Sequence, residues 1–324
     1  MQPDTHNKRI IPIIIGANGW LGTAARHLVA RWPQLSKPII FGSGKTKRQE
    51  ENVTIYPLSS FGDILADFPI QNEYIILNFA YLTKDKVSTI SDEDYAKAAK
   101  SINDNVASLI QSVKPLAFLF ISSGAASMVE KGLATSHDLL IYGQQKMEDE
   151  AFFGAVCLHD NVKYLSPRLF NIGGPFINKF DAYVLSNFIL QSLSQGQILI
   201  KANRPIYRSY CHVFDLLNLL FSEMISPQKT NITPAFEVGG NAPVEMADLA
   251  QIVANATNLS SEKILRHDFN PMLEPDYYVA NNSDFESLLA RHSLPQTPIA
   301  AIVTSTLDYI TYHHPNQTVP IKSR

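Results

Sequence analysis

Three glycines at a fixed spacing join an apolar run to a helical segment near the start of the chain. Residues 10–15 have the composition of a buried strand, and Gly16, Gly19 and Gly22 follow it three residues apart. Residues without a Cβ let the backbone approach a ligand closely, and the first helical turn offers N–H groups and partial positive charge. The spacing therefore predicts a turn that cradles the pyrophosphate of a dinucleotide. We expect the cofactor to contact Gly16, Asn18, Gly19, Trp20, Leu21 and Gly22.

The first half of the chain alternates short β-branched runs with longer helical segments, which is typical of a parallel sheet. We expect strands at residues 10–15, 38–41, 53–56, 74–79, 117–122 and 163–168, and helices at 22–31, 92–113 and 142–153. Beyond these, proline is more frequent and the alternation is weaker, with helices expected at 214–224, 247–256 and 300–312. These patterns predict an α/β fold, a Rossmann-type doubly wound parallel sheet with a smaller C-terminal substrate-binding lobe. The dinucleotide-binding domain would span residues 1–170, with 205–225 returning to it, and the lobe mainly residues 171–324.

Charge and composition exclude several classes of partner. The formal net charge is −3, so no electrostatic attraction to nucleic acid or to an anionic membrane is expected. No apolar run approaches the roughly 20 residues that a membrane crossing needs. Cys157 and Cys211 are far apart, and the histidines lack ligand spacing, so we expect no metal site. We interpret the chain as cytoplasmic.

The segment after the second expected strand bears on the choice of cofactor. An NAD site usually places a carboxylate at the end of that strand, where it binds the ribose 2′-hydroxyl. Here the strand ends Phe41-Gly42-Ser43-Gly44, and Lys45, Lys47 and Arg48 follow. The absence of an acid and the presence of bases favour NADP, with Ser43 and Lys45 as contacts of the 2′-phosphate. A solvated basic loop is the alternative, and NAD stays possible.

A tyrosine and a lysine four residues apart begin the helix expected at 142–153. The spacing places Tyr142 and Lys146 on one helical face. A neighbouring ammonium favours the phenolate, so that the tyrosine can act as a general acid or base. The pair by itself is common in proteins, but the strand at 117–122 ends in Ser122-Ser123, where open α/β sheets bind ligands. The order favours a Ser-Tyr-Lys catalytic set.

With these motifs the chain resembles the extended short-chain dehydrogenases/reductases, the nucleotide-sugar epimerase/dehydratase group, nearly end to end. The resemblance implies Ser123, Tyr142 and Lys146 as the catalytic set, with Ser122 beside the cofactor or itself the hydroxyl if the alignment moves by one residue. Asn78-Phe79-Ala80 falls where the family has a motif under the nicotinamide ribose, which implies cofactor contacts for Phe79 and Ala80. Asn105 matches the asparagine of the family's long-helix motif.

The second half carries two further matches to the family. The segment 168–175, Arg-Leu-Phe-Asn-Ile-Gly-Gly-Pro, implies that Asn171 contacts the substrate. The segment 208–215, Arg-Ser-Tyr-Cys-His-Val-Phe-Asp, implies that Arg208 binds a substrate phosphate, while Ser123 would bind the reacting group.

The resemblance also implies a homodimer through the helices at 92–113 and 142–153. Glu148, Asp149 and Glu150 are interpreted as a solvated helix face.

The residues after the fifth strand bear on the reaction. By the family resemblance, dehydratases of this group have the residues Thr-Asp-Glu at these positions. This chain has Ser123-Gly124-Ala125, so a 4,6-dehydratase is not expected. Two enzymes remain: a 4-keto sugar reductase using NADPH, which we favour, and a nucleotide-sugar 4-epimerase with tightly bound NAD. A non-catalytic dinucleotide-binding sensor or scaffold is the alternative of another class.

Overall fold

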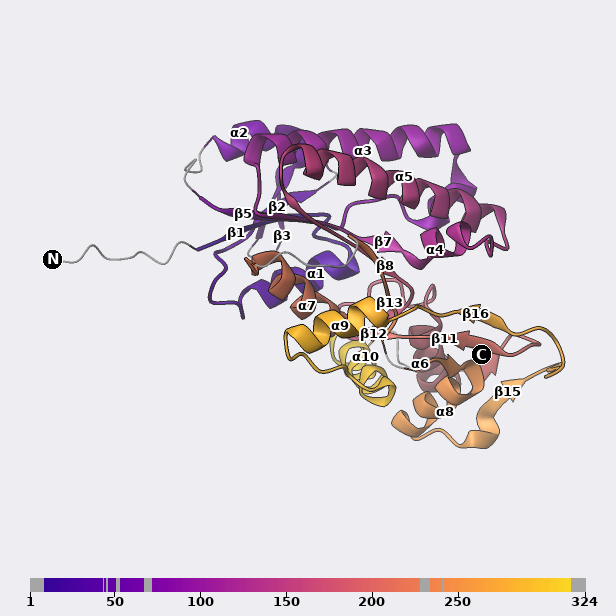
Figure 1. The fold of residues 1–324 in the computed structure, drawn as a ribbon. Coiled ribbons are helices and arrows are strands. Elements are labelled where there is room, and N and C mark those ends of the chain that lie inside the picture. Colours follow the sequence, from indigo (N-terminus) through magenta and orange to yellow (C-terminus); the bar gives the residue numbers. More distant parts are fainter. Residues whose placement is uncertain are drawn as a thin grey trace. The chain divides into compact units, whose positions relative to one another are not determined.

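The computed structural model describes residues 9–42, 44, 46–50, 53–66, 72–227, 234–240 and 242–315. The chain divides into two compact units (Figure 1). The first contains the described residues up to Arg168 together with Leu220–Phe236, and the second contains Leu169–Leu219 and the residues from Glu237 onward.

The first unit is built on one large sheet. Its strands are β1 (Ile11–Ile15), β2 (Ile39–Gly42), β3 (Arg48–Glu50), β4 (Val53–Pro57), β5 (Tyr74–Asn78), β6 (Ala117–Phe120), β7 (Ser122–Ser123), β8 (Lys163–Leu169) and β13 (Ala235–Val238). The order is β13-β8-β6-β5-β1-β2-β4-β3, with β7 also paired to β8. From β4 through β2, β1, β5 and β6 to β8 the pairs are parallel, and β3 is antiparallel to β4. The strand order reverses at β1, which confirms the predicted doubly wound Rossmann-type sheet.

Helices cover both faces of this sheet (Figure 1). They are α1 (Trp20–Val29), α2 (Phe61–Leu65), α3 (Asp92–Val113), α4 (Gly124–Glu130) and α5 (His137–His159), with 3₁₀ turns η1 (Leu58–Ser60) and η2 (Lys84–Thr89). Alternation along β1 directs Ile13 and Ile15 into an apolar cluster with Val106 of α3 and Phe153 of α5. The core that supports the carboxyl ends of the strands therefore lies under α3 and α5.

The predicted limits of α3 and α5 can be compared with the capping residues that the structure shows. Helix α3 has the predicted limits, because the Ser91 side chain accepts a hydrogen bond from Asp94 N and Lys114 ends the helix with φ of 46°. Helix α5 begins at His137 and not at Tyr142, because Ser136 caps it by accepting from Leu139 N. The predicted start at Tyr142 is therefore wrong, and Tyr142 lies in the second turn.

The second unit combines helices with three small sheets. Its helices are α6 (Val184–Gln195), α8 (Met246–Ala256), α9 (Ser283–Arg291) and α10 (Ile299–His313), with η3 (Ser261–Lys263), and α7 (Val213–Ile225) runs from this unit into the first. Its strands are β9 (Ile172–Gly173) with β12 (Cys211–His212), β10 (Ile198–Ile200) with β15 (Ile264–Arg266), and β14 (Val244–Glu245) with β11 (Ile206–Arg208) and β16 (Asp276–Tyr278). Within the described ranges, no helix combines the length and apolar composition that a membrane crossing requires.

Candidate functional site

The glycine turn between β1 and α1 is pressed against the end of β5. Gly16 has φ of +80°, and a Cβ placed on it would lie 2.7 Å from the Ala80 nitrogen and 2.7 Å from the Phe79 carbonyl carbon. A Cβ on Gly22 would collide with the Gly16 carbonyl oxygen. The backbone can follow this path only because these two positions lack side chains. The packing also places Phe79 and Ala80 beside the turn.

The start of α1 fits a phosphate group. Gly19 is the N-cap residue and has no side chain that could accept from the N–H groups of the first turn. Trp20 and Leu21 are buried, so their side chains pack into the core and only their backbone atoms are available to a ligand at this end. A cradle that Cβ atoms would fill, at an uncapped helix N-terminus, fits the pyrophosphate of a dinucleotide.

A carboxylate that the sequence analysis did not anticipate reaches this turn. Glu50 Oε1 accepts a hydrogen bond of 3.0 Å from Asn18 Nδ2 and lies 3.8 Å from Arg48 Nη1. Glu50 belongs to β3, a short antiparallel strand that no sequence pattern indicated. Of the predicted contacts of the 2′-phosphate, Ser43 and Lys45 lie outside the described residues. Arg48 lies near the end of β2, since a Cβ on Gly44 would be 3.6 Å from Arg48 Nε.

The two serines after β6 have different partners. The Ser123 side chain is the N-cap of α4 and accepts a hydrogen bond of 3.2 Å from Ala125 N. As a hydroxyl it retains its own proton to donate. The Ser122 hydroxyl instead donates to Glu150 Oε1 in the buried interior. Of the two, Ser122 is therefore committed to a carboxylate, and Ser123 keeps a donor for another group.

Lys146 is almost completely enclosed, with 1% of its surface exposed. Its Nζ donates a hydrogen bond of 2.9 Å to the Ile121 carbonyl oxygen. The same ammonium lies 3.5 Å from the ring centroid of Tyr81 and 5.8 Å from that of Tyr142. Burial lowers the pKa of Lys146 to about 7, against the opposing effect of two nearby carboxylates on α5. The group can thus change charge near neutral pH.

Close helix packing positions the tyrosine. A Cβ on Gly143 would lie 2.5 Å from the Ala125 carbonyl oxygen, so α5 approaches α4 more closely than a side chain would permit. Tyr142, the residue before this glycine, is buried in a cluster with Ala125 and Tyr95. Tyr142 therefore packs against the helix that Ser123 caps, and the structure brings all three predicted catalytic residues to one region of the first unit.

The acidic run on α5 is not a solvated face, so that prediction is wrong for Asp149 and Glu150. Only Glu148 is exposed, whereas Asp149 and Glu150 are 4% and 8% exposed. Glu150 accepts from Arg168 through both oxygens, at 2.8 Å and 2.7 Å. The sequence contained a signal of their burial, because Asp149 and Glu150 lie three and four residues after Lys146 and share its side of the helix.

The predicted cofactor contact on α3, Asn105, and the neighbouring Asn103 lie in different surroundings. Asn105 Nδ2 donates to the Ser101 carbonyl of its own helix and lies along a surface groove with Lys100 and Asp104. Asn103 is instead buried, and its Nδ2 donates to Asp149 Oδ1 at 2.6 Å. The helical periodicity that buries Asn103 turns Asn105 away from the Lys146 region.

Two of the predicted substrate residues, Asn171 and Arg208, belong to the second unit. Asn171 Nδ2 donates to the Ser209 carbonyl at 3.0 Å. Arg208, at the end of β11, pairs with Asp276 of β16 through Nη1 to Oδ1 at 3.1 Å and Nη2 to Oδ2 at 3.2 Å. The Arg208 side chain is 20% exposed, so a ligand would have to compete with Asp276 for it.

Comparisons with known proteins agree with the observed fold. UDP-glucuronic acid decarboxylase 3 of Arabidopsis thaliana is 33% identical over 95 residues, which are 29% of this chain and only 27% of that protein's length. The solved UDP-N-acetylglucosamine 4-epimerase of Methanobrevibacter ruminantium aligns with a TM-score of 0.73 at 16% identity, over 94% of this chain and 99% of that chain. The UDP-glucuronic acid 4-epimerase of Bacillus cereus, solved in complex with NAD, aligns with a TM-score of 0.68 at 16% identity, over 94% of this chain and 100% of that chain.

The model of the NAD dependent epimerase/dehydratase family matches residues 13–239, which is more than half of the chain. The match begins within β1 and ends with β13, so it includes the glycine turn and the Ser-Tyr-Lys set. The resemblance inferred from the motifs, and with it the expectation of an enzyme, is confirmed. The chain belongs to the NAD dependent epimerase/dehydratase family.

Proposed function

We propose that the chain is a nucleotide-sugar 4-epimerase that keeps its NAD bound through the reaction. The observation that carries the proposal is the convergence of Ser123, Tyr142 and Lys146 in the unit that also holds the glycine cradle. Positions 124 and 125, where an eliminating enzyme needs acids, are Gly124 and Ala125. The set suffices for moving a proton and a hydride, and it lacks an acid for expelling water.

The roles of the residues follow from their contacts. The bound dinucleotide supplies the carbon that accepts and returns a hydride. Tyr142 takes the proton of the sugar hydroxyl as that carbon is oxidised and gives it back when the carbonyl is reduced. Lys146 stabilises the phenolate by its charge, and Ser123 donates a hydrogen bond to the reacting oxygen. Asn171 and Arg208 are the proposed contacts of the nucleotide part.

Similarity supports the epimerase over net reduction. Both solved neighbours described above are named 4-epimerases of UDP-sugars, and one was solved with NAD. Glu50 also brings a carboxylate to Asn18 in the glycine turn, and a carboxylate near the adenosine ribose is typical of NAD sites. The sequence alone favoured a reductase with NADP because it did not reveal this acid.

A 4-keto sugar reductase using NADPH is the second candidate, and Arg48 is the observation that favours it. Its guanidinium lies beside Gly42 and Gly44, where a 2′-phosphate would be placed, and Lys47 follows the same segment. The two candidates differ in whether the cofactor leaves. An exchangeable NADP serves net reduction, and a retained NAD serves epimerisation.

One purification and one assay distinguish the candidates. The dinucleotide released by denaturing the purified protein is identified, and the protein is then incubated with UDP- and dTDP-sugars bearing either a 4-hydroxyl or a 4-keto group. Interconversion of 4-epimers without added cofactor, with NAD released, supports the proposal. NADPH oxidation with a 4-keto sugar would overturn it in favour of the reductase, and no turnover despite a bound dinucleotide would indicate a sensor.

Replacing the phenol tests the proposed chemistry directly. Tyr142→Phe is expected to lower kcat by roughly 10²- to 10⁴-fold, because the general acid/base is removed, and to retain the dinucleotide. Tyr312→Phe, at a tyrosine that is 82% exposed, is the matched control and should keep full activity. A Tyr142→Phe variant as active as the control would exclude this tyrosine from the reaction.

The homodimer is a further part of the proposal. On α5, Phe152 is 36% exposed and Leu158 is 84% exposed. Two apolar side chains on the outside of one helix support association through that helix. The molar mass in solution, from light scattering, tests it.

A further inference from the structure

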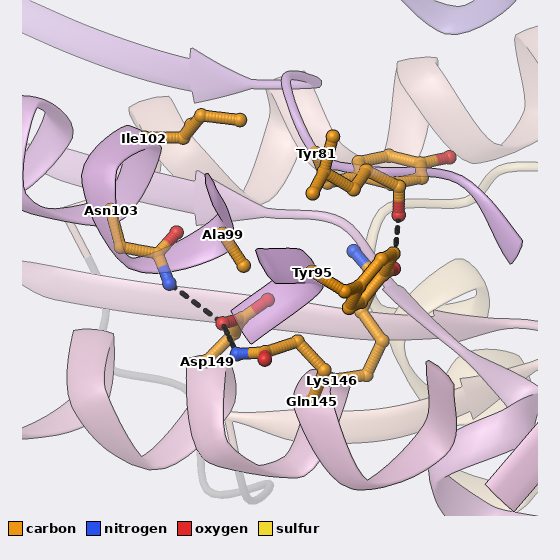
Figure 2. A pocket seen from close by; sticks show the side chains of 9 residues that line it. Tyr81, Tyr95, Ala99, Ile102, Asn103, Gln145, Lys146 and Asp149 are labelled. Atoms are coloured by element: carbon orange, nitrogen blue, oxygen red, sulfur yellow. Dashed lines mark hydrogen bonds between the residues drawn. The ribbon is translucent and has the colours of Figure 1, made fainter. Parts of the chain in front are cut away.

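A small cavity lies beside Lys146, between α3, α5 and the segment that follows β5 (Figure 2). Its volume is about 10 Å³, the least that holds one water molecule. The polar side chains around it belong to Tyr81, Tyr95, Asn103, Gln145, Lys146 and Asp149. A small space lined by both a lysine and an aspartate is suited to proton exchange.

One carboxylate oxygen of Asp149 accepts two hydrogen bonds. Its Oδ1 accepts from Asn103 Nδ2 at 2.6 Å and from Gln145 Nε2 at 2.9 Å, as Figure 2 shows. Among the described residues, no hydrogen bond reaches its Oδ2. Two amides from two helices thus fix the carboxylate, and Oδ2 is left to exchange a proton with the cavity.

Lys146 offers the complementary group. Of its three N–H donors, one is used by the Ile121 carbonyl oxygen, and the Tyr81 ring lies 3.5 Å from Nζ. Because Lys146 also lines the cavity, one water there would connect its ammonium to Asp149. Within the described part of the chain, no other Asp, Glu, Lys, Arg or His lines that space.

Other ionisable groups lie near the pair. Glu150 is ion-paired with Arg168, and the ring centroids of Tyr81 and Tyr142 lie 3.5 Å and 5.8 Å from Lys146 Nζ. Burial raises the pKa of Tyr95 on α3 and of Tyr164 in β8, with smaller contributions from Asp85 and Asp149 for the first, so both phenols stay neutral. The two groups whose pKa values burial moves toward each other are Lys146 and Asp149.

We propose that Asp149 is the proton store of the site. Through one water, Lys146 gives up a proton and becomes a neutral amine while Asp149 becomes a carboxylic acid, and the reverse step restores the ion pair. The number of protons is unchanged and none crosses to bulk solvent. In the proposed reaction, on which this use depends, the exchange adjusts the charge beside Tyr142 as the phenol gains and loses its proton.

Burial acts on the two groups in opposite directions. It lowers the pKa of Lys146 to about 7 and raises the pKa of Asp149, with the hydrogen bonds from Gln145 and Asn103 opposing the rise. The charged pair and the neutral pair consequently approach each other in free energy. A pair of this kind titrates as a unit.

The experiment follows Lys146 itself and needs no substrate. The protein, labelled with ¹³C-lysine, is titrated by NMR, and the Cε signal of Lys146 is assigned by its loss in Lys146→Met. Asp149→Asn keeps an oxygen that accepts from Asn103 and Gln145 but removes the charge. Without the carboxylate the ammonium is less stable, so the Lys146 midpoint should fall by about one pH unit or more. The alkaline limit of kcat in an active enzyme should fall with it.

Glu148→Gln is the matched control, since it removes the same charge from the exposed neighbouring position. It should leave the midpoint unchanged. If Asp149→Asn does not fold, Asn103→Ala replaces it: loss of one donor favours protonated Asp149, and the midpoint should fall by a smaller amount. A midpoint that is the same in the Asp149 or Asn103 variant as in the wild type would overturn the proposal, as would an equal shift in Glu148→Gln. A shifted midpoint in a protein that converts no nucleotide sugar would leave this inference standing and remove the proposed function.

Discussion

The two compact units of the chain differ in how deeply their charged side chains are buried. Among the described residues, every Asp, Glu, Lys or Arg in the buried class lies in the first unit: Lys146, Asp149, Glu150, Arg168 and Glu223; in the second unit His212 is also buried. In the second unit the side chains of Arg266 and Glu245 are 10% and 14% exposed, and those of Arg208 and Asp276 are 20% and 44% exposed. The first unit therefore encloses its charged groups more completely than the second.

The difference separates two tasks. Enclosing a charge costs desolvation free energy, so a cluster of enclosed charges beside Tyr142 and Lys146 indicates a fixed environment for proton transfer. A partly exposed pair contributes little to stability, and in the proposed function Arg208 would exchange Asp276 for a ligand phosphate at low cost. We expect substitutions in the first unit to cost stability and those in the second to alter affinity.

Glu150→Gln should give the largest change in stability. It leaves the Arg168 guanidinium enclosed with Glu130 as its one remaining carboxylate, and it also weakens the acceptor for Ser122. We expect a loss of about 3 kcal/mol in the free energy of unfolding, measured by urea denaturation. Glu148→Gln, two residues earlier on the same helix and exposed, should stay within about 0.5 kcal/mol. Equal effects of the two substitutions would remove the distinction between enclosed and exposed acids.

Gly22→Ala should come second, and it tests the cradle. The added Cβ would collide with the Gly16 carbonyl oxygen and force the turn open. We expect a loss of about 2 kcal/mol of stability and at least a tenfold weaker binding of dinucleotide, measured by calorimetry. The control is Gly62→Ala in α2, where a Cβ meets nothing within 4 Å and should stabilise the helix slightly. Unchanged dinucleotide affinity in Gly22→Ala would argue against phosphate binding at this turn.

Asp276→Asn should have the smallest effect on stability. The pair that it removes is half exposed, so the cost should be under about 1 kcal/mol. Freed from its partner, Arg208 should bind the substrate with equal or lower KM, whereas Arg208→Ala should raise KM about tenfold with little change in kcat. A KM that rises in Asp276→Asn as much as in Arg208→Ala would mean that the pair acts as structural support and not as a phosphate site.

Local features of the sequence were sufficient for the parallel strands of the large sheet. The β-branched runs marked the parallel strands, and Gly16 and Gly22 marked a turn that admits no side chain. The limits of α3 followed from its periodicity, whereas those of α5 did not, because the cap at Ser136 was overlooked. The Ser-Tyr-Lys set was recognisable because its spacing lies within one helix and one strand end.

Contacts between distant segments decided the rest. Periodicity tells which side chains share a side of α5, but not that α3 covers that side and supplies Asn103 to Asp149, 46 residues away. In the same way, Glu50 reaches Asn18 across 32 residues only because β3 folds back on β4. The sequence by itself determined the sheet, the glycine turn and the family. The tertiary structure alone decided which carboxylates are enclosed, because burial depends on what packs over a helix and not on the order of residues along it.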